Sequence, residues 1–380
     1  MCMKTVIILG AGEMQIPVIK KVNELGYCSI ALDYDKDAVG LKYANKSYVV
    51  SSTDVDKVLE VAQKENADAL LTTSDYPVNV VAAVSKTMGL VSMSKEVANI
   101  CTNKFLQRKV FSTYGINSPE YFLVSGNGIS VEKYNNYPYI VKPVDSSASR
   151  GVKKVNDSNE LLNAIEEAKE YSRSGQVLIE QFIGGKEFSV ETLTQNGETT
   201  IVSITEKLVI GEEYGYFVED THIEPARITK EEWQLIENEV VKALEAIQID
   251  NSPSHTEVKL WNGKPYIIET ACRLGGDYIT SDLVPLSTGI DMLANLVRLS
   301  VGESIDRNRT LNKVACVQFL NVQNYNRCCA FIESNDPHII RYEIKPYRNK
   351  RIENSLDRLG YIIVQCEDYS ELRDILDKIK

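Results

Sequence analysis

The sequence lacks an excess of positive charge and any long apolar run. Its 380 residues include 42 Lys and Arg against 53 Asp and Glu, a formal net charge of −11. Proteins that hold nucleic acid through phosphate contacts need surplus basic residues, so this balance argues against nucleic acid as a partner. No apolar run approaches the roughly 18 residues of a membrane-spanning helix, which argues against a membrane protein.

Metal-binding cysteine and histidine motifs are also missing. None of the eight cysteines forms a C-x-x-C pair, and the only histidines are His222, His255 and His338. Such spacings provide no zinc site. Residues 6–9 are apolar but are followed by Gly-Ala-Gly rather than a cleavage site, so we expect a buried strand there, no export signal, and free thiols in a reducing cytoplasm.

What the first hundred residues do contain is an alternation of apolar runs and helical patterns. Because alternating strands and helices form parallel sheets with helices on both faces, the fold class expected here is α/β, with a doubly wound sheet. The expected strands are residues 5–9, 28–32, 46–51 and 69–72, and the expected helices are residues 14–25, 55–64 and 78–88.

Two features of this region allow alternative readings. Gly10 and Gly12 follow a strand, and Asp33 lies about 20 residues on, as in dinucleotide-binding turns, but Gln15 stands where that fingerprint has its third glycine. The glycines therefore indicate either a nucleotide site or only a tight turn. The loop at residues 72–77 follows a strand end, where it either contacts a substrate or caps the next helix.

Further elements follow along the chain. We expect a helical region at 95–114, strands at 121–124 and 139–141, a helix at 159–171, and strands at 177–179 and 188–191. The last part of the chain predicts strands at 314–322, 328–332 and 360–365 before a terminal helix at 370–379.

Two clusters in the middle of the chain suggest a nucleotide site. Lys142 ends an apolar strand, where a lysine is costly unless it meets an anion, and residues 145–151 form a small, hydroxyl-rich loop suited to phosphates. Glu180 leaves a buried strand and is followed by an apolar pair, two glycines and Glu187, a plausible cradle for a flat heterocycle and its ribose. The alternatives are a plain hairpin and a turn with solvated acids.

The third cluster is a hairpin around Asn262-Gly263 that carries Glu257 and Glu269. A two-residue loop places the two glutamates on opposite faces, whereas a three-residue loop places them on one face. The three-residue loop also groups Val258, Leu260, Tyr266 and Ile268 on a buried face, so we predict it. Two neighbouring carboxylates then favour a divalent cation between them, such as Mg²⁺.

Together these clusters resemble the ATP-grasp superfamily, in particular its carboxylate–amine ligases, which include amino-acid ligases, phosphoribosylglycinamide synthetases and biotin carboxylases. The resemblance covers nearly the whole chain. It implies a Rossmann-like pre-ATP-grasp domain (1–95), an ATP-grasp domain (96–305) with a lid subdomain (about 116–180), and a C-terminal β-rich segment (306–380). The motifs that carry it are Asn103-Lys104-Phe105, residues 139–143, 147–151, 180–183 and 187–191, and the Glu257…Glu269-x-Ala271-x-Arg273 hairpin.

The resemblance also implies roles. An ATP- and Mg²⁺-dependent (or Mn²⁺-dependent) cytoplasmic ligase would join a small carboxylate, such as an amino acid, to an amine through an acyl phosphate. Ala271 replaces the Asn that often assists a second metal, so one or two ions would bind. The oligomeric state is left open, a homodimer included. The implied residues are Lys104, Lys142, Ser147, Ser149, Gly151, Glu180, Phe182, Ile183 and Glu187 for ATP, Glu257 and Glu269 for the metal, and Arg273 and His222 for catalysis.

Two other functional classes stay open at this point. A non-catalytic ATP-binding regulatory protein could share the fold, although retention of Glu257, Glu269 and Arg273 argues against it. An NAD-type oxidoreductase would use Gly10 and Asp33 but would leave the Lys142 loop and the glutamate hairpin unexplained.

Overall fold

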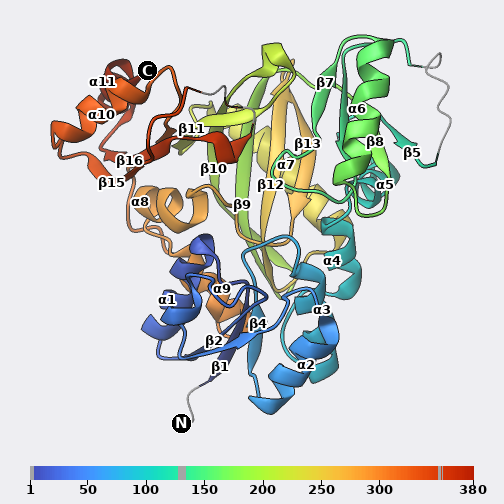
Figure 1. Cartoon of the computed structure of the whole chain (residues 1–380), viewed down its shortest axis with the longest axis vertical. Coiled ribbons are helices and arrows are strands. Elements are labelled where there is room, and N and C mark those ends of the chain that lie inside the picture. Colours follow the sequence, from blue (N-terminus) through green and yellow to red (C-terminus); the bar gives the residue numbers. More distant parts are fainter. Residues whose placement is uncertain (1–3, 127–133, 350–351, 353) are drawn as a thin grey trace.

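The computed structural model describes residues 4–126, 134–349, 352 and 354–380. Three sheets organise the chain, and their strands account for the expected α/β class. The N-terminal sheet lies at the bottom of Figure 1, the large central sheet stands above it, and a smaller sheet with α6 lies at the upper right. No described helix is long and apolar enough to cross a membrane.

The N-terminal sheet is parallel, with strand order β3-β2-β1-β4. The buried residues of β1 and β4 are all apolar, as expected for strands covered on both faces. The predicted helices at 55–64 and 78–88 coincide with α2 and α3. The bounds are β1 Thr5–Leu9, α1 Ile16–Glu24, β2 Cys28–Asp33, β3 Lys46–Val49, α2 Val55–Lys64, β4 Ala69–Leu71 and α3 Val78–Met88.

The glycine turn after β1 is closed by the protein itself. The Asp33 carboxylate accepts a hydrogen bond from the backbone N–H of Ala11 (2.7 Å). Gly10 has a φ of +97°, and Gly40 packs so tightly that a Cβ there would lie 2.5 Å from the Ala11 carbonyl oxygen. These contacts favour the tight-turn interpretation over a dinucleotide site.

The helical region at 95–114 is two helices rather than one. The side chain of Asn103 accepts a hydrogen bond from Leu106 N (3.1 Å), which caps a new helix and places Lys104 at its first position. Lys104 N also donates to the carbonyl of Val144 (2.8 Å), so this helix start is tied to the loop after β6. The bounds are α4 Lys95–Cys101 and α5 Lys104–Tyr114.

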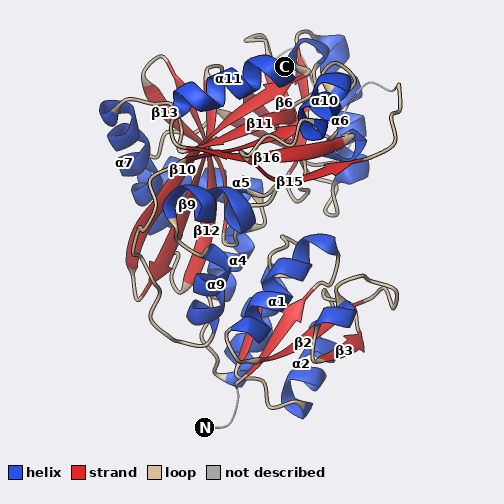
Figure 2. Ribbon diagram, turned by 90° about the vertical axis from the view of Figure 1, so that its left-hand side faces the viewer, coloured by secondary structure: helices blue, strands red, loops and turns tan. Residues whose placement is uncertain are grey.

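The small antiparallel sheet has strand order β5-β8-β6-β7 and is covered by α6. Figure 2 shows it beside the larger sheet, above the N-terminal sheet. The expected strands at 139–141 and 177–179 are extended by two residues each. The bounds are β5 Tyr121–Val124, β6 Tyr139–Pro143, β7 Lys153–Val155, α6 Ser158–Tyr171 and β8 Val177–Gln181.

The large sheet has eight strands in the order β13-β12-β9-β10-β11-β14-β16-β15. One apolar cluster joins it to the N-terminal sheet, because Val6 and Ile8 share a core with Leu193 and Phe319. The bounds are β9 Lys186–Gln195, β10 Glu198–Ile210, β11 Val218–Glu224, α7 Lys230–Ile247, β12 Ser252–Trp261, β13 Lys264–Ala271, α8 Val284–Thr288, α9 Met292–Ser300, β14 Val314–Phe319, α10 Tyr325–Glu333, β15 Ile339–Ile344, β16 Gly360–Cys366 and α11 Tyr369–Ile379.

The prediction of a strand at 328–332 is wrong, because these residues lie in helix α10. Cys328, Phe331 and Ile332 are its buried residues, and their i, i+3, i+4 spacing matches one face of a helix. The rest of the C-terminal part adds three strands to the large sheet. The seven cysteines that the structure describes are free, as expected, whereas Cys2 lies outside the described residues.

Candidate active site

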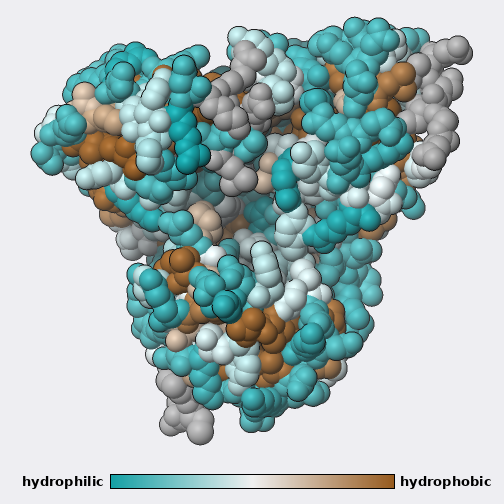
Figure 3. All heavy atoms as spheres, in the orientation of Figure 1, coloured by the Kyte–Doolittle hydropathy of each residue, from teal (hydrophilic) through white to brown (hydrophobic). Residues whose placement is uncertain are grey.

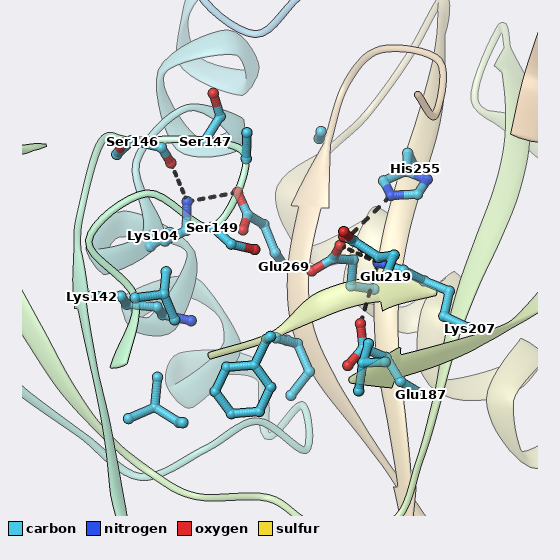
Figure 4. Close-up of a pocket in the computed structure, with 18 of the residues that line it drawn as sticks. Lys104, Lys142, Ser146, Ser147, Ser149, Glu187, Lys207, Glu219, His255 and Glu269 are labelled. Atoms are coloured by element: carbon cyan, nitrogen blue, oxygen red, sulfur yellow. Dashed lines mark hydrogen bonds and ion pairs between the residues drawn. The ribbon is translucent and has the colours of Figure 1, made fainter. Parts of the chain in front are cut away.

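A cavity of about 340 Å³ opens where the N-terminal loop at 72–77, the small sheet and the large sheet meet. Every residue that the sequence proposed for the site lines this cavity, with Gly151 as the exception. Gly151 packs on Tyr171 instead, and a Cβ at this position would lie 2.9 Å from that ring. Figure 4 shows Lys104, Lys142 and the serine loop on one side, Lys207 and Glu187 on the other, and Glu269 between them.

The hairpin of β12 and β13 has a two-residue turn, so the predicted three-residue loop is wrong. Trp261 pairs with Lys264, and Asn262 and Gly263 have φ values of 51° and 72°. Positive φ at both central residues matches the twist of a tight hairpin, which is the reason for the strong preference of Asn-Gly for such turns.

Glu257 and Glu269 nevertheless face each other. The register shifts between Glu257 and Val258, so Val258 pairs with Ile267 while Glu257 pairs with Glu269. Ile268 is the extra residue of this bulge, and a bulge reverses which side chains share a face. Consequently Ile267, rather than Tyr266 or Ile268, joins Val258 in the buried core, and Ile268 lines the cavity.

A buried arginine that sequence reasoning missed holds this bulge. Arg108, on α5, has no exposed surface and donates from Nη2 to the carbonyl of Ile268 (2.6 Å). Its Nε also lies 2.8 Å from an oxygen of Glu180, whose other oxygen is 2.7 Å from Lys142 Nζ. Arg108 therefore links the carboxylate expected at the base site with the hairpin expected at the metal site.

Burial and pairing shift the pKa values of this group in opposite directions. Burial lowers the pKa of Lys142 below its ordinary value, and Arg108 adds to the effect against the opposing pull of Glu180. Burial would raise the pKa of Glu180, but Arg108 and Lys142 outweigh it and lower that pKa. Glu180 is thus held as a carboxylate inside the protein.

Each glutamate of the hairpin has a lysine partner. Lys104 Nζ lies 2.9 Å from Glu269 Oε1 and donates to the carbonyl of Ser146 (2.7 Å). Lys207 Nζ lies 2.9 Å from Glu257 Oε1 and 3.2 Å from Glu187 Oε1. Although burial opposes it, these carboxylates raise the pKa of both lysines, so both carry positive charge.

The hydroxyl-rich loop lies over the same end of the cavity. Ser147 and Ser149 line it, and the backbone at Ala148 and Ser149 has positive φ, 57° and 55°. Consecutive residues in this conformation can turn their N–H groups toward one anion. Phosphate binding by this loop stays a prediction.

The base end of the cavity contains Phe182, Ile183 and Glu187. Lys154 Nζ lies 4.1 Å from the centroid of the Phe182 ring, and Lys259 Nζ lies 3.6 Å from Glu187 Oε2. Phe182 N donates to a carbonyl of its own chain, that of Pro138 (3.4 Å).

Arg273 and His222 line the same cavity, and His222 pairs with Lys207 across strands β11 and β10. Arg273 forms a two-point ion pair with Asp75 (2.6 and 3.0 Å), which decides that the loop at 72–77 belongs to the site. His222 is 1% exposed, and neither of its ring nitrogens has a hydrogen-bond partner among the described residues. Burial, reinforced by Lys207, lowers its pKa to about 3, so the ring is neutral.

Sequence reasoning also missed His255 and Arg358. His255 Nδ1 bonds Glu191 Oε1 (2.5 Å), and although burial opposes it, Glu191 raises the pKa of His255 to about 9. Side chains two residues apart on a strand point to the same face. Because His255 stands two residues before Glu257, this alternation could have placed His255 in the site. Arg358, which lies near the C-terminal end of the chain, bridges Glu219 (2.9 Å) and Asp277 (2.8 Å). No sequence motif around Arg358 indicates this role.

Comparison with known proteins agrees with this geometry. Residues 135–282 match the family model of the ATP-grasp domain. Residues 135–282 are thus an ATP-grasp domain. A D-alanine–D-alanine ligase of Flavobacterium psychrophilum is 33% identical over 147 residues, covering 38% of this chain and 44% of that protein. An alanine–anticapsin ligase of Bacillus subtilis is 25% identical over 252 residues, covering 58% and 52%.

The ATP-grasp fold extends over the whole chain. An L-amino acid ligase from Bacillus licheniformis superposes with a TM-score of 0.81 at 22% identity, covering 99% of this chain and 97% of that one. At this identity the likeness concerns the fold. The sequence alignments span about half the length of the two curated ATP-grasp relatives named above.

Proposed function

We propose that this chain is an ATP- and Mg²⁺-dependent ligase that joins a small-molecule carboxylate to an amine. The observation that carries the proposal is the placement of Glu257 opposite Glu269 in a cavity that also holds Lys104 and Lys142. A protein that only binds a nucleotide needs basic side chains for the phosphates. A pair of carboxylates beside those basic side chains is, in addition, suited to phosphoryl transfer. The sequence relatives are themselves named as ligases, which supports the same reaction class.

In this proposal ATP lies between the two sheets. Glu180 and the backbone of Phe182 and Ile183 receive the base, and Glu187 accepts from the ribose hydroxyls. Ser147 and Ser149 cover the phosphates, while Lys104 and Lys142 neutralise their charge. Lys142 is buried against Glu180, so it is positioned to act between base and phosphates.

The residues present fit a magnesium ion. Glu257 and Glu269 are directly paired across the hairpin, and about 28% and 29% of their side chains are exposed. Mg²⁺ usually takes one or two carboxylates and completes its shell with water and nucleotide phosphates, and these residues supply two. When bound, it would neutralise the phosphate oxygens and align them. Ala271 offers no further ligand, so this hairpin supports one well-defined ion.

The remaining residues would hold the organic substrates. Arg273 can meet an anionic oxygen of the phosphorylated carboxylate with its two-donor fork. Neutral His222 can donate to or accept from a substrate atom, because both ring nitrogens lack protein partners among the described residues. Glu219 and Asp277, which Arg358 bridges, line the same cavity. The reaction is then formation of an acyl phosphate and ADP, attack by the amine, and release of phosphate. These features favour amino-acid-like substrates.

A screen of carboxylate and amine pairs tests the proposal. With Mg-ATP, phosphate release should require both organic substrates, and hydroxylamine in place of the amine should trap the acyl group as a hydroxamate. The Glu269→Gln variant is the matched control and should release markedly less phosphate than the wild type at the same Mg²⁺ concentration. ATP binding without phosphate release for any pair, including amino acids, would instead favour a regulatory ATP-binding protein.

A further inference from the structure

Strand β15 is the last strand of the eight-stranded sheet and has one open edge. Among the described residues it pairs with β16 and with no other strand. Figure 1 places it at the outer left of the molecule, on the side away from the small sheet. An open edge presents backbone N–H and C=O groups that another strand can pair with.

The side chains of this strand are unusually apolar for an exposed edge. Ile340, Tyr342 and Ile344 are 48%, 53% and 39% exposed. Figure 3 shows a brown, hydrophobic area at the upper left, over the region of β15, β16 and α10 in Figure 1. Arg341 and Glu343 alternate with these residues, so the strand carries opposite charges two positions apart.

We propose that a second copy of this chain adds its own β15 to this edge, antiparallel, about a two-fold axis at Tyr342. In this register Arg341 lies opposite Glu343 of the second copy, and Glu343 lies opposite the second copy's Arg341. Tyr342 meets its own copy on the other face, whereas Ile340 is the extra residue of a bulge and lies outside the regular pairing. The self-complementary order Arg-Tyr-Glu is the observation that selects this partner.

Charge also selects the register. Moving the axis to Glu343 would place Glu343 opposite itself and Arg341 opposite Lys345, which gives only like-charge pairs. Moving it to Arg341 would place Arg341 opposite itself. An axis at Ile344 would pair Glu343 with Lys345, but Lys345 lies beyond the end of β15, so within the strand only the axis at Tyr342 gives two opposite-charge pairs. The register shift between Ile339 and Arg341 leaves residues 341–344 as the regularly paired part of the strand.

The same charges have a competing interpretation. Charged residues and bulges on edge strands also protect monomers from association. That interpretation predicts that the wild type is a monomer. It also predicts that each charge-reversal variant is a monomer and that a mixture of the two variants forms no dimer. The two interpretations therefore differ in a direct experiment.

The experiment uses the full chain and two variants, Arg341→Glu and Glu343→Arg, in sedimentation velocity over a concentration series. The wild type should dimerise, and each variant alone should dissociate about tenfold more readily or more, because both cross-strand pairs become like-charged. An equimolar mixture should dimerise again, since positions 341 and 343 are then both acidic in one chain and both basic in the other. A monomeric wild type, or a mixture that stays dissociated, overturns the proposal.

The mixing step separates the interface from local damage. Arg341 also contacts Asp282 (3.4 Å) and lies over the rings of Tyr278 and Tyr361, so its loss could disturb the fold. Such damage would persist in the mixture, whereas restored pairing would not. Arg327→Glu and Glu333→Arg, the same charge changes on exposed positions of α10, form the control pair and should leave dimerisation unaltered. Loss of the dimer in these controls would contradict the proposed edge.

Discussion

Asp75 and Arg273 lie 198 positions apart in the sequence and form a two-point ion pair in the wall of the cavity. Asp75 belongs to the loop after β4, whereas Arg273 follows β13 of the large sheet. Burial would raise the pKa of Asp75, but Arg273 outweighs it, so the aspartate stays charged. The pair joins the loop after β4 of the N-terminal sheet to the residue proposed to bind the reacting carboxylate.

Replacing Asp75 by Asn keeps the size of the side chain but removes the charge that orients the guanidinium. We expect substrate-dependent phosphate release to fall by about tenfold or more, with ATP affinity little changed, because Arg273 stands away from the base end. Steady-state kinetics with each substrate varied in turn measures this. Asp56→Asn, on the exposed face of α2, is the control. An Asp75→Asn variant with wild-type kinetics would remove the positioning role.

Arg108 should contribute strongly to stability. Arg108→Met leaves Glu180 buried with only Lys142 as its charged partner and removes the donor that holds the Ile268 carbonyl. Removing one member of a buried pair costs about 3–5 kcal/mol, so we expect a loss of that order in the free energy of unfolding by urea. Arg307→Met breaks an exposed pair with Glu198 and should cost no more than about 1 kcal/mol. Equal losses in the two variants would contradict the assigned role.

Local pattern was enough to predict most elements, because it depends on residues close in sequence. The helix predicted at 55–64 and the strand predicted at 121–124 match α2 and β5. Where local spacing was misread, at 328–332, the buried face of α10 still follows the 3.6-residue period. The candidate site residues were proposed from local motifs, and the structure places all of them except Gly151 around one cavity.

The geometry of the hairpin could not be predicted in this way. The Asn-Gly turn is local, and its preference for two residues was correctly indicated by sequence, but the bulge at Ile268 depends on Arg108, 160 positions earlier. Two deviations from the expected hairpin, the shorter turn and the bulge, cancel each other and return Glu257 and Glu269 to one face. Lys207 and Arg358 were missed for the same reason, because their partners come from distant strands.

The metal prediction is tested by Glu257→Gln and Glu269→Gln. Each amide keeps the shape of the side chain but loses the charge that favours a divalent cation. We expect the Mg²⁺ concentration for half-maximal phosphate release to rise by about tenfold or more, and maximal release to fall. Titrating Mg²⁺ at saturating ATP measures both. Glu198→Gln, exposed at the start of β10, is the control. An unaltered Mg²⁺ dependence in both hairpin variants would remove the metal assignment.

His222 should make the protein sensitive to acid. Its pKa in the folded state, about 3, lies below the ordinary value of 6.5, because burial disfavours the charged ring. Below about pH 6.5 the His222 ring therefore binds a proton in the unfolded chain but not in the folded chain. Because of this difference, His222 destabilises the folded state as the pH falls from 6.5 toward 3. At pH 5 the difference amounts to roughly 2 kcal/mol.

In His222→Gln, which cannot be protonated in this range, the free energy of unfolding should decline less between pH 7 and pH 5 than in the wild type. Urea unfolding at a series of pH values measures the two slopes. Identical slopes would mean that His222 reaches water or a proton acceptor in solution. The proposal that a neutral His222 ring lies in the substrate site would then be wrong.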